Sequence, residues 1–196
     1  MGYTTDFNGE FMLDKPLAPE DLDFLNKLNQ TRRMKRNVGP EFGVDGEFYV
    51  AGDGDNYLLS DDELKPSNIV NHNTPPNTQP GLWCGWRPND NGTAIEWDGG
   101  EKFYEYVAWI QYLITKILAP RGYSLTGDVH WQGEDSDDKG KIVIKNNKVK
   151  VLNGYTYFSG QPRKRLRAKR TKLQEVAWIE KRIAELKTKK KNLVNG

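Results

Sequence analysis

The sequence predicts an α+β fold, a two-layer sandwich in which helices cover one face of a mainly antiparallel sheet. Two observations support this class. Apolar residues alternate along 122–133 and 140–152, as in strands, and recur every three or four positions along 101–118, as in a helix. The predicted order of strands and helices also admits the ferredoxin-like arrangement, in which two strand–helix–strand units share one sheet.

The first fifth of the chain predicts one strand and one helix. Residues 3–17 are expected to be extended, with Asn8–Gly9 as a turn signal. Residues 17–37 are expected to form a helix, because Pro19 suits its first turn and leucines recur behind it at helical spacing. The four cations at 32–36 suit the negative end of this helix, and anion binding by the same cluster is the alternative.

A loop-rich stretch and a hairpin follow. Residues 39–80 are rich in Gly, Asp, Asn and Pro and are expected to form loops, apart from a short strand at 46–50. Residues 81–100 are expected to form two strands around a turn, because two apolar runs flank a cluster of Asn, Asp and Gly.

The second half of the body predicts a helix and three strands. The helix is expected at 101–118, with Asp98 or Glu101 at its positive N-terminal end. Residues 140–152 are expected to form two strands around an Asn146–Asn147 turn. Along 122–133 the alternation is expected to place Leu125, Val129 and Trp131 on one face and Asp128, His130 and Gln132 on the other.

The C-terminal segment differs from the rest in both pattern and charge. Residues 163–196 predict a long amphipathic helix, so the expected organisation is an α+β domain at 1–155 and a basic amphipathic helical extension at 156–196. The net charge of +2 divides into about −8 for residues 1–160 and +10 for residues 161–196. Such an asymmetry is informative about binding partners.

Composition narrows the cellular setting. No stretch approaches the roughly 20 apolar residues that cross a bilayer, so no membrane span is expected. The single cysteine, Cys84, has no internal partner for a disulfide, and a cytoplasmic location is expected.

Several long motifs resemble a family of uncharacterised bacterial and phage proteins. They are "GYTTDF", "TRRMKRN", "GLWCGW", "IEWDGGEKFYEY" and "HWQGEDSDDKGKIVI", within residues 2–151. The resemblance implies a phage or prophage setting, in the cytoplasm of a host cell, and implies no particular activity.

The acidic stretch at 134–138 is a candidate metal or catalytic site. Asp135 and Asp137, with Gly140, match three positions of a calcium loop, but a lysine and an asparagine replace two of its ligands. An EF-hand is therefore not expected, and Asp135 and Asp137 stay as candidates for a looser divalent-cation site. The alternative is a solvated turn between strands. No other cofactor is indicated.

A second candidate is a ligand site for a base or nucleotide, built from aromatic and charged side chains. An exposed histidine beside a carboxylate is the minimum for acid–base chemistry, so the acidic strand contributes to this candidate. The alternative is ordinary packing and helix capping. The candidate residues are Trp86, Arg87, Trp97, Asp98, Asp128, His130 and Glu134.

The strongest binding signal is the basic cluster that opens the C-terminal segment. Six cations in eight residues would attract phosphate groups and release counterions. These are Arg163, Lys164, Arg165, Arg167, Lys169 and Arg170.

The leading hypothesis is a non-enzymatic, phage-type accessory protein that binds a host component. Its basic C-terminal helix would engage nucleic acid, RNA or a ribonucleoprotein, and a host protein is a further candidate partner. One alternative is a nucleotide- or metal-dependent enzyme or sensor that uses the acidic cluster at 128–138. Another is oligomerisation through the C-terminal helix, although its apolar stripe keeps no strict heptad.

Overall fold

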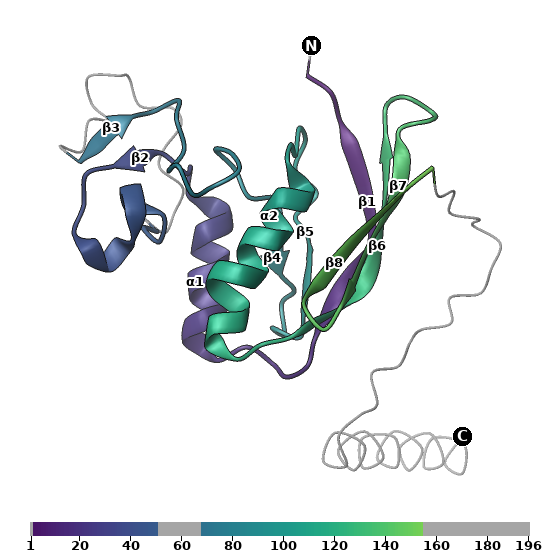
Figure 1. Cartoon of the computed structure of the whole chain (residues 1–196), viewed down its shortest axis with the longest axis horizontal. Coiled ribbons are helices and arrows are strands. Elements are labelled where there is room, and N and C mark those ends of the chain that lie inside the picture. The colour runs from purple at the N-terminus through teal and green to yellow at the C-terminus, as the bar shows by residue number, and fades with distance from the viewer. Residues whose placement is uncertain (1, 51–67, 155–196) are drawn as a thin grey trace, which may run out of the picture. The chain divides into compact units, whose positions relative to one another are not determined.

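The computed structural model describes residues 2–50 and 68–154, and this part of the chain has an α+β fold (Figure 1). Residues 51–67, part of the stretch expected to form loops, and the predicted C-terminal helix lie outside the described residues. The strands are β1 (Thr5–Leu13), β2 (Lys35–Arg36), β3 (Ile69–Asn71), β4 (Trp86–Pro88), β5 (Ala94–Trp97), β6 (Leu125–Gly133), β7 (Lys139–Lys145) and β8 (Lys148–Asn153). The two α-helices are α1 (Pro19–Gln30) and α2 (Tyr106–Tyr112). One π-helical stretch, Leu113–Leu118, continues α2 directly.

Six strands form one antiparallel sheet in the order β4-β5-β1-β6-β7-β8. Its longest pairing joins β1 to β6, with Thr5 opposite Gly133 and Leu13 opposite Leu125. The short strands β2 and β3 pair separately, with Lys35 opposite Asn71.

The order of elements matches the ferredoxin-like arrangement. Helix α1 connects β1 to β4, and β5 lies between these two strands in the sheet. Helix α2 connects β5 to β6, and β1 lies between them. Each strand–helix–strand unit is thus split by a strand of the other unit, which is the hallmark of this topology. Strands β7 and β8 extend the sheet beyond β6.

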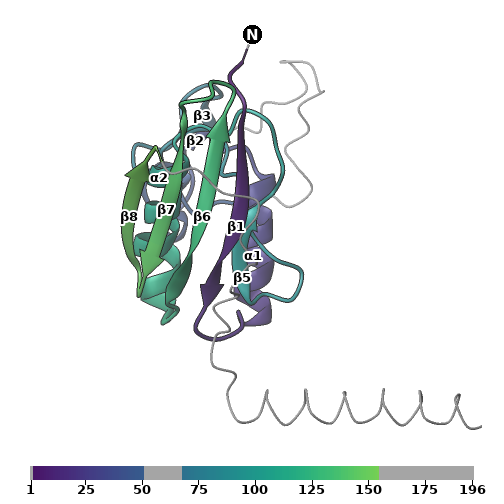
Figure 2. The ribbon, with the colours of Figure 1, turned by 90° about the vertical axis from the view of Figure 1, so that its right-hand side faces the viewer.

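Both helices cover the same face of the sheet, so the hydrophobic core lies between the two layers (Figure 2). Phe11 and Ile95 are fully buried from the sheet side, and Trp109 and Ile110 are fully buried from α2. Leu25 and Leu28 of α1 complete this layer. The alternation predicted for β6 is confirmed, because Leu125, Val129 and Trp131 are buried whereas Asp128, His130 and Gln132 are at least partly exposed.

The predicted turn at Asn8–Gly9 is wrong, because β1 runs through it as one continuous strand. Pairing with β6 along the whole of β1 prevents this segment from folding back on itself. Gly9 has a φ of 119°, and a Cβ there would lie 2.5 Å from the Asp128 carbonyl oxygen. The glycine therefore permits a close approach of the two backbones rather than a turn.

Three other boundaries differ from the predictions. Helix α1 ends at Gln30, so the cations at 32–36 do not lie on a helix end. Residues 46–50 form no strand. Helix α2 begins at Tyr106, after Glu105 in a left-handed conformation, so neither Asp98 nor Glu101 lies at its N-terminus. Boundaries of elements depend on tertiary contacts as well as on the local sequence pattern.

Candidate functional site

The charge of the side chains changes from strand to strand across the sheet face that points away from the helices. Figure 2 shows the strands of this sheet in order. Asp6 and Glu10 of β1 are exposed on this face, and Glu10 lies opposite Asp128 of β6. Beyond them, β7 and β8 contribute only cationic charge. The lysines whose side chains alternate onto this face are Lys139, Lys141, Lys145, Lys148 and Lys150. The face thus changes from acidic at β1 to basic at the β7–β8 hairpin.

Asp128, His130 and Lys141 lie close together where the acidic part of this face meets the basic part. One carboxylate oxygen of Asp128, Oδ2, lies 3.1 Å from Lys141 Nζ and 3.4 Å from His130 Nε2. Partial burial and the Lys141 charge together lower the pKa of His130 below its usual 6.5, against the opposing effect of Asp128. The expected His–carboxylate proximity is present, and the lysine favours a neutral imidazole.

The far end of the hairpin holds three lysines on one face. Asn146 and Asn147 both have positive φ angles, of 47° and 65°, and turn the chain tightly between β7 and β8. This turn places Lys145 directly opposite Lys148, and Lys150 follows on the same face. All three side chains are exposed.

The acidic loop between β6 and β7 stabilises the chain's N-terminal segment. Asp138 accepts hydrogen bonds from the Tyr3 hydroxyl at 2.7 Å and from Trp131 Nε1 at 3.2 Å. Glu134 accepts one from the backbone N–H of Thr4 at 2.8 Å. The hydrogen bond that the Tyr3 hydroxyl donates to Asp138 raises the pKa of Tyr3. These two carboxylates therefore have structural partners that the sequence does not reveal.

Asp135 and Asp137 are exposed in this loop. Within residues 2–50 and 68–154, no group of three or more His, Cys, Asp or Glu side chains converges to hold a metal ion. The candidate divalent-cation site is thus without a geometric basis in the described part of the chain.

The sheet separates the other predicted ligand-site residues. Trp86 and Trp97 lie opposite one another on the helix-facing side, where both contact Phe7 edge to face. Arg87 lies on the other side and pairs with Glu96 at 3.1 Å. Trp86 is buried and donates from its indole to the Tyr106 carbonyl at 2.8 Å. The structure therefore does not bring these residues together with Asp128 and His130.

Asp98 instead lines a groove of about 660 Å³ beside the N-terminal end of α2. One of its oxygens accepts from Asn29 Nδ2 at 2.7 Å and the other from the Gly100 N–H at 2.8 Å. Trp83 and Tyr104 also line this groove, and they are 40% and 54% exposed. Motif reasoning did not single out these two aromatic residues, although Trp83 lies in the "GLWCGW" stretch.

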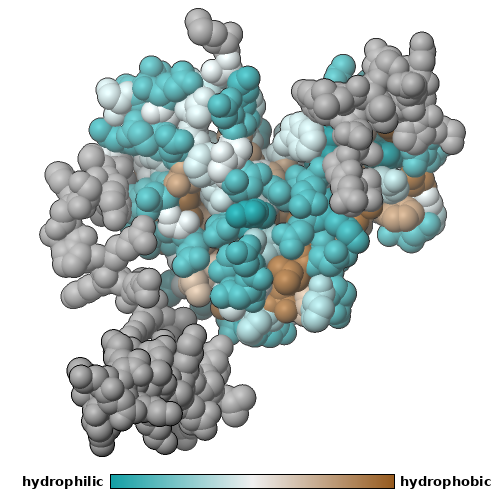
Figure 3. All heavy atoms as spheres, turned by 180° about the vertical axis from the view of Figure 1, so that it is seen from behind, coloured by the Kyte–Doolittle hydropathy of each residue, from teal (hydrophilic) through white to brown (hydrophobic). Residues whose placement is uncertain are grey.

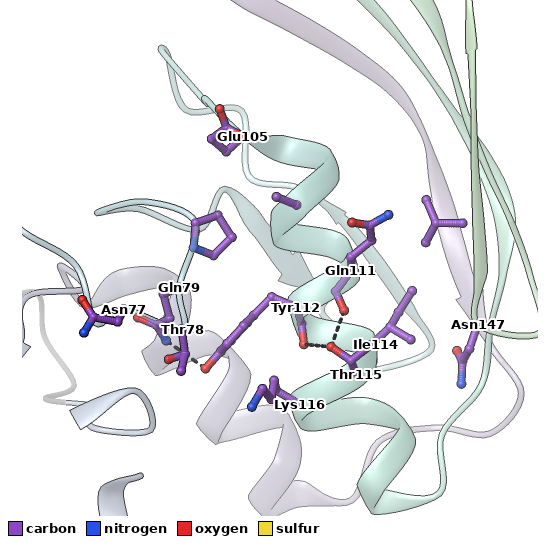
Figure 4. A pocket seen from close by; sticks show the side chains of 13 residues that line it. Asn77, Thr78, Gln79, Glu105, Gln111, Tyr112, Ile114, Thr115, Lys116 and Asn147 are labelled. Atoms are coloured by element: carbon purple, nitrogen blue, oxygen red, sulfur yellow. Dashed lines mark hydrogen bonds between the residues drawn. The ribbon is translucent and has the colours of Figure 1, made fainter. Parts of the chain in front are cut away.

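A second hollow, of about 710 Å³, lies beside α2 and β8 and is lined in part by Gln79, Tyr112 and Lys116 (Figure 4). Gln79 and Tyr112 point toward one another, and Gln79 Nε2 lies 3.0 Å from the Tyr112 hydroxyl. The same amide donates to the Glu47 carbonyl at 2.7 Å. This wall of the hollow is thus a polar network, and it extends into the interior.

Arg33 completes that network inside the protein and is only 2% exposed. Its guanidinium donates to Gln79 Oε1 at 3.2 Å, the Tyr49 carbonyl at 2.7 Å and the Glu47 carbonyl at 2.9 Å. The Glu47 carboxylate accepts from the Tyr112 hydroxyl at 3.1 Å. The network joins the segment after α1 to α2. Because every contact is long-range, only the three-dimensional structure reveals it.

Cys84 is buried, and burial raises the pKa of its thiol to about 12. A buried thiol with a raised pKa is typical of a packed cysteine rather than a reactive one. No helix in the described ranges is long and apolar enough to cross a membrane. The surface seen from behind Figure 1 is mainly hydrophilic, with small apolar areas (Figure 3).

Comparisons with family models, curated proteins and solved structures give no match to this chain. The six predicted nucleic-acid-binding residues at 163–170 lie outside the residues that the structure describes.

Proposed function

We propose that this protein binds nucleic acid through basic side chains that begin in the β7–β8 hairpin and continue along the chain to 163–170. One observation carries the proposal. Lys145 and Lys148 lie directly opposite one another, and Lys150 follows on the same face. Like charges in such positions repel and destabilise a sheet. A phosphate backbone bound across the hairpin would reverse that cost.

The surroundings of these lysines support the same interpretation. None of the three has an ion-pair partner among residues 2–50 and 68–154, whereas Lys141, earlier in β7, pairs with Asp128. Their charge is thus available for an anionic partner. The exposed side of the hairpin carries no aromatic side chain, so the contacts would be to phosphates rather than to bases.

The division of charge along the sequence also falls at this hairpin. After Asp138 the chain contains eighteen Lys or Arg and three Glu, and the first of those Glu residues is Glu175. From β7 to the cluster at 163–170, every charged side chain in the sequence is therefore cationic. Such a segment would bind phosphates with little sequence preference and strong dependence on salt.

In this proposal the protein is a non-enzymatic accessory protein of phage type that acts on a host ribonucleoprotein or RNA in the host cytoplasm. The phage setting rests on the resemblance of its long motifs to bacterial and phage proteins. The binding role rests on the charged hairpin. Host proteins bound to such an RNA are further candidate partners.

The experiment is a titration of a fluorescent 30-nucleotide RNA with the full chain at several salt concentrations. The test variant is the triple substitution Lys145→Gln, Lys148→Gln and Lys150→Gln. It should weaken binding about tenfold and reduce the slope of log affinity against log salt by about 2, for three contacts to a single strand.

A matched control keeps the change in net charge the same. It substitutes three lysines elsewhere on the body: Lys15→Gln, Lys27→Gln and Lys116→Gln. The control should leave the salt slope nearly unchanged. If both triple variants weaken binding equally, only net charge matters and the hairpin surface is not the site.

A further inference from the structure

We infer that the groove lined by Trp83 and Tyr104 is a binding site for a planar heteroaromatic ring, such as a free nucleobase or nucleotide. This inference is separate from the nucleic-acid surface on the hairpin. It rests on three observations: exposed aromatic rings, a buried indole without a partner, and a backbone held in an unfavourable conformation.

The first observation is the exposure of the rings. Trp83 and Tyr104 are the two exposed aromatic side chains in the described part of the chain, and both line the same groove. Large aromatic surfaces in water favour burial against a flat partner. The Arg32 guanidinium lies 6.0 Å from the centre of the Trp83 ring. A cation beside this ring disfavours a cationic ligand, whereas a neutral ring can stack on an aromatic side chain.

The second observation is the indole N–H of Trp109. This side chain is fully buried, and its Nε1 has no hydrogen-bond partner among the described residues. Leaving a buried donor unpaired costs about 1–3 kcal/mol. A Cβ added to Gly81, which lines the groove, would lie 3.6 Å from this nitrogen.

That same added Cβ would meet no other heavy atom of the described chain within 4 Å, apart from its sequence neighbours. Open space therefore adjoins Gly81 on the side that faces the indole nitrogen, and the nitrogen itself is closed to solvent. An acceptor atom of a ligand seated in this space would approach the indole N–H past Gly81, and the carbonyl oxygens and ring nitrogens of nucleobases are such acceptors.

The third observation is the backbone between β5 and α2. Lys102 and Glu105 have φ angles of 61° and 54°, which non-glycine residues rarely adopt, and both line the groove. Strain of this kind costs of order 1–3 kcal/mol per residue and is concentrated at binding sites. The Asp98 carboxylate is held by Asn29 and Gly100 at one wall, so its position is fixed before a ligand arrives.

The size of the groove agrees with this class of ligand. Its volume of about 660 Å³ lies within the roughly 300–1,000 Å³ of small-molecule sites. Gly81 allows a ligand to approach the backbone closely, whereas the space beside Gly85 is filled by the Phe103 ring.

The experiment follows the indole N–H signals of the full chain by NMR during titration with AMP and with GMP. Ribose 5-phosphate is the control ligand without a base. At least one nucleotide should shift the Trp109 indole proton and the Trp83 indole proton, and ribose 5-phosphate should shift neither. Equal shifts with ribose 5-phosphate would mean that the groove recognises the sugar phosphate, and would overturn the inference.

Gly81→Ala is the most specific variant. Its methyl group fits without a clash, because the contact of 3.6 Å is an ordinary one, but it occupies the space in front of Trp109 Nε1. We expect it to retain the folded spectrum and to weaken nucleotide binding at least tenfold. Tyr104→Ala should weaken binding through loss of stacking. Val151→Ala, at an exposed apolar residue outside the groove lining, should have no effect.

Two outcomes separate this inference from the proposed function. The hairpin triple variant should still bind the nucleotide, because its lysines are not among the residues that line the groove. The groove is not the site if Gly81→Ala and Tyr104→Ala both bind the nucleotide as tightly as the native chain. It is also not the site if neither nucleotide shifts an indole signal of the native chain.

Discussion

Arg33 stabilises the fold through buried contacts to segments distant in the sequence. It is buried and donates to three acceptors, Gln79 Oε1 and the carbonyls of Glu47 and Tyr49, of which the Glu47 carbonyl also accepts from Gln79 Nε2. Removing Arg33 takes a donor from the desolvated Gln79 Oε1 and Tyr49 carbonyl, which adds to the cost of removing the cation. Gln79 in turn contacts Tyr112, which carries the effect to α2.

We therefore predict that Arg33→Met lowers the free energy of unfolding by about 3–5 kcal/mol. The control is Lys27→Met, which removes an exposed pair with Asp23 at 2.8 Å and should cost less than about 1 kcal/mol. Urea unfolding followed by circular dichroism measures both. Equal midpoints for the two variants would contradict the structural role assigned to Arg33.

His130 gives the stability a pH dependence of known sign. Its pKa is lowered in the folded state by burial and by Lys141, so the unfolded chain binds more protons below pH 6.5. The free energy of unfolding should thus rise with pH through the window between the lowered pKa and 6.5, and fall on acidification. His130→Gln should flatten this dependence between pH 5.5 and 7.5. Urea midpoints at the two pH values check it, and an unchanged slope would count against it.

At the scale of an element, the β7–β8 hairpin depends on its two-residue turn. Asn147 Oδ1 accepts from the Leu125 N–H at 2.7 Å, and Asn147 Nδ2 donates to the Tyr123 carbonyl at 3.0 Å. The side chain of Asn146 makes no such bond to β6, although its backbone has a similar positive φ. The two asparagines thus have the same backbone role and different side-chain roles.

Glycine substitutions separate these roles, because glycine adopts positive φ freely. Asn146→Gly should leave the free energy of unfolding within about 0.5 kcal/mol of the native value. Asn147→Gly should lower it by about 1–3 kcal/mol, because the Leu125 N–H and the Tyr123 carbonyl lose their partner. Thermal unfolding of the two variants side by side tests this, and the reverse order of stability would refute it.

The elements differ in how much the sequence reveals of them. The strands β6, β7 and β8 and the apolar face of α2 follow from periodicity, because one buried face imposes a regular spacing. The end of α1 does not, because Arg33 leaves the helix to reach acceptors distant in sequence. The proximity of Asp128 and His130 was predictable by alternation along β6, whereas the Trp86–Trp97 pair depends on the register of β4 with β5. The distance between the two pairs depends on the strand order of the sheet.

At the scale of the whole molecule, the two basic regions of the chain are predicted to contribute additively to the salt dependence of RNA binding. If the hairpin and the cluster at 163–170 contact different phosphates of one RNA, their salt dependences sum. Substituting Arg163, Lys164, Arg165, Arg167, Lys169 and Arg170 by Gln in the full chain should reduce the salt slope by about 4. Combining this variant with the hairpin triple variant should reduce it by about 6. A combined slope no smaller than that of the six-residue variant would show that the hairpin contributes no contact.

The pairing of β1 with β6 has a consequence for how the protein is made. The partners Thr5 and Gly133 are separated by most of the described body, as are all the pairs between them. At roughly 5–20 residues per second, synthesis leaves β1 without its main partner for about 6–25 seconds. During that interval a central strand with a buried apolar face is exposed. Until β6 is synthesised, the unpaired edges of β1 can pair with other strands, and only its polar outward face opposes this.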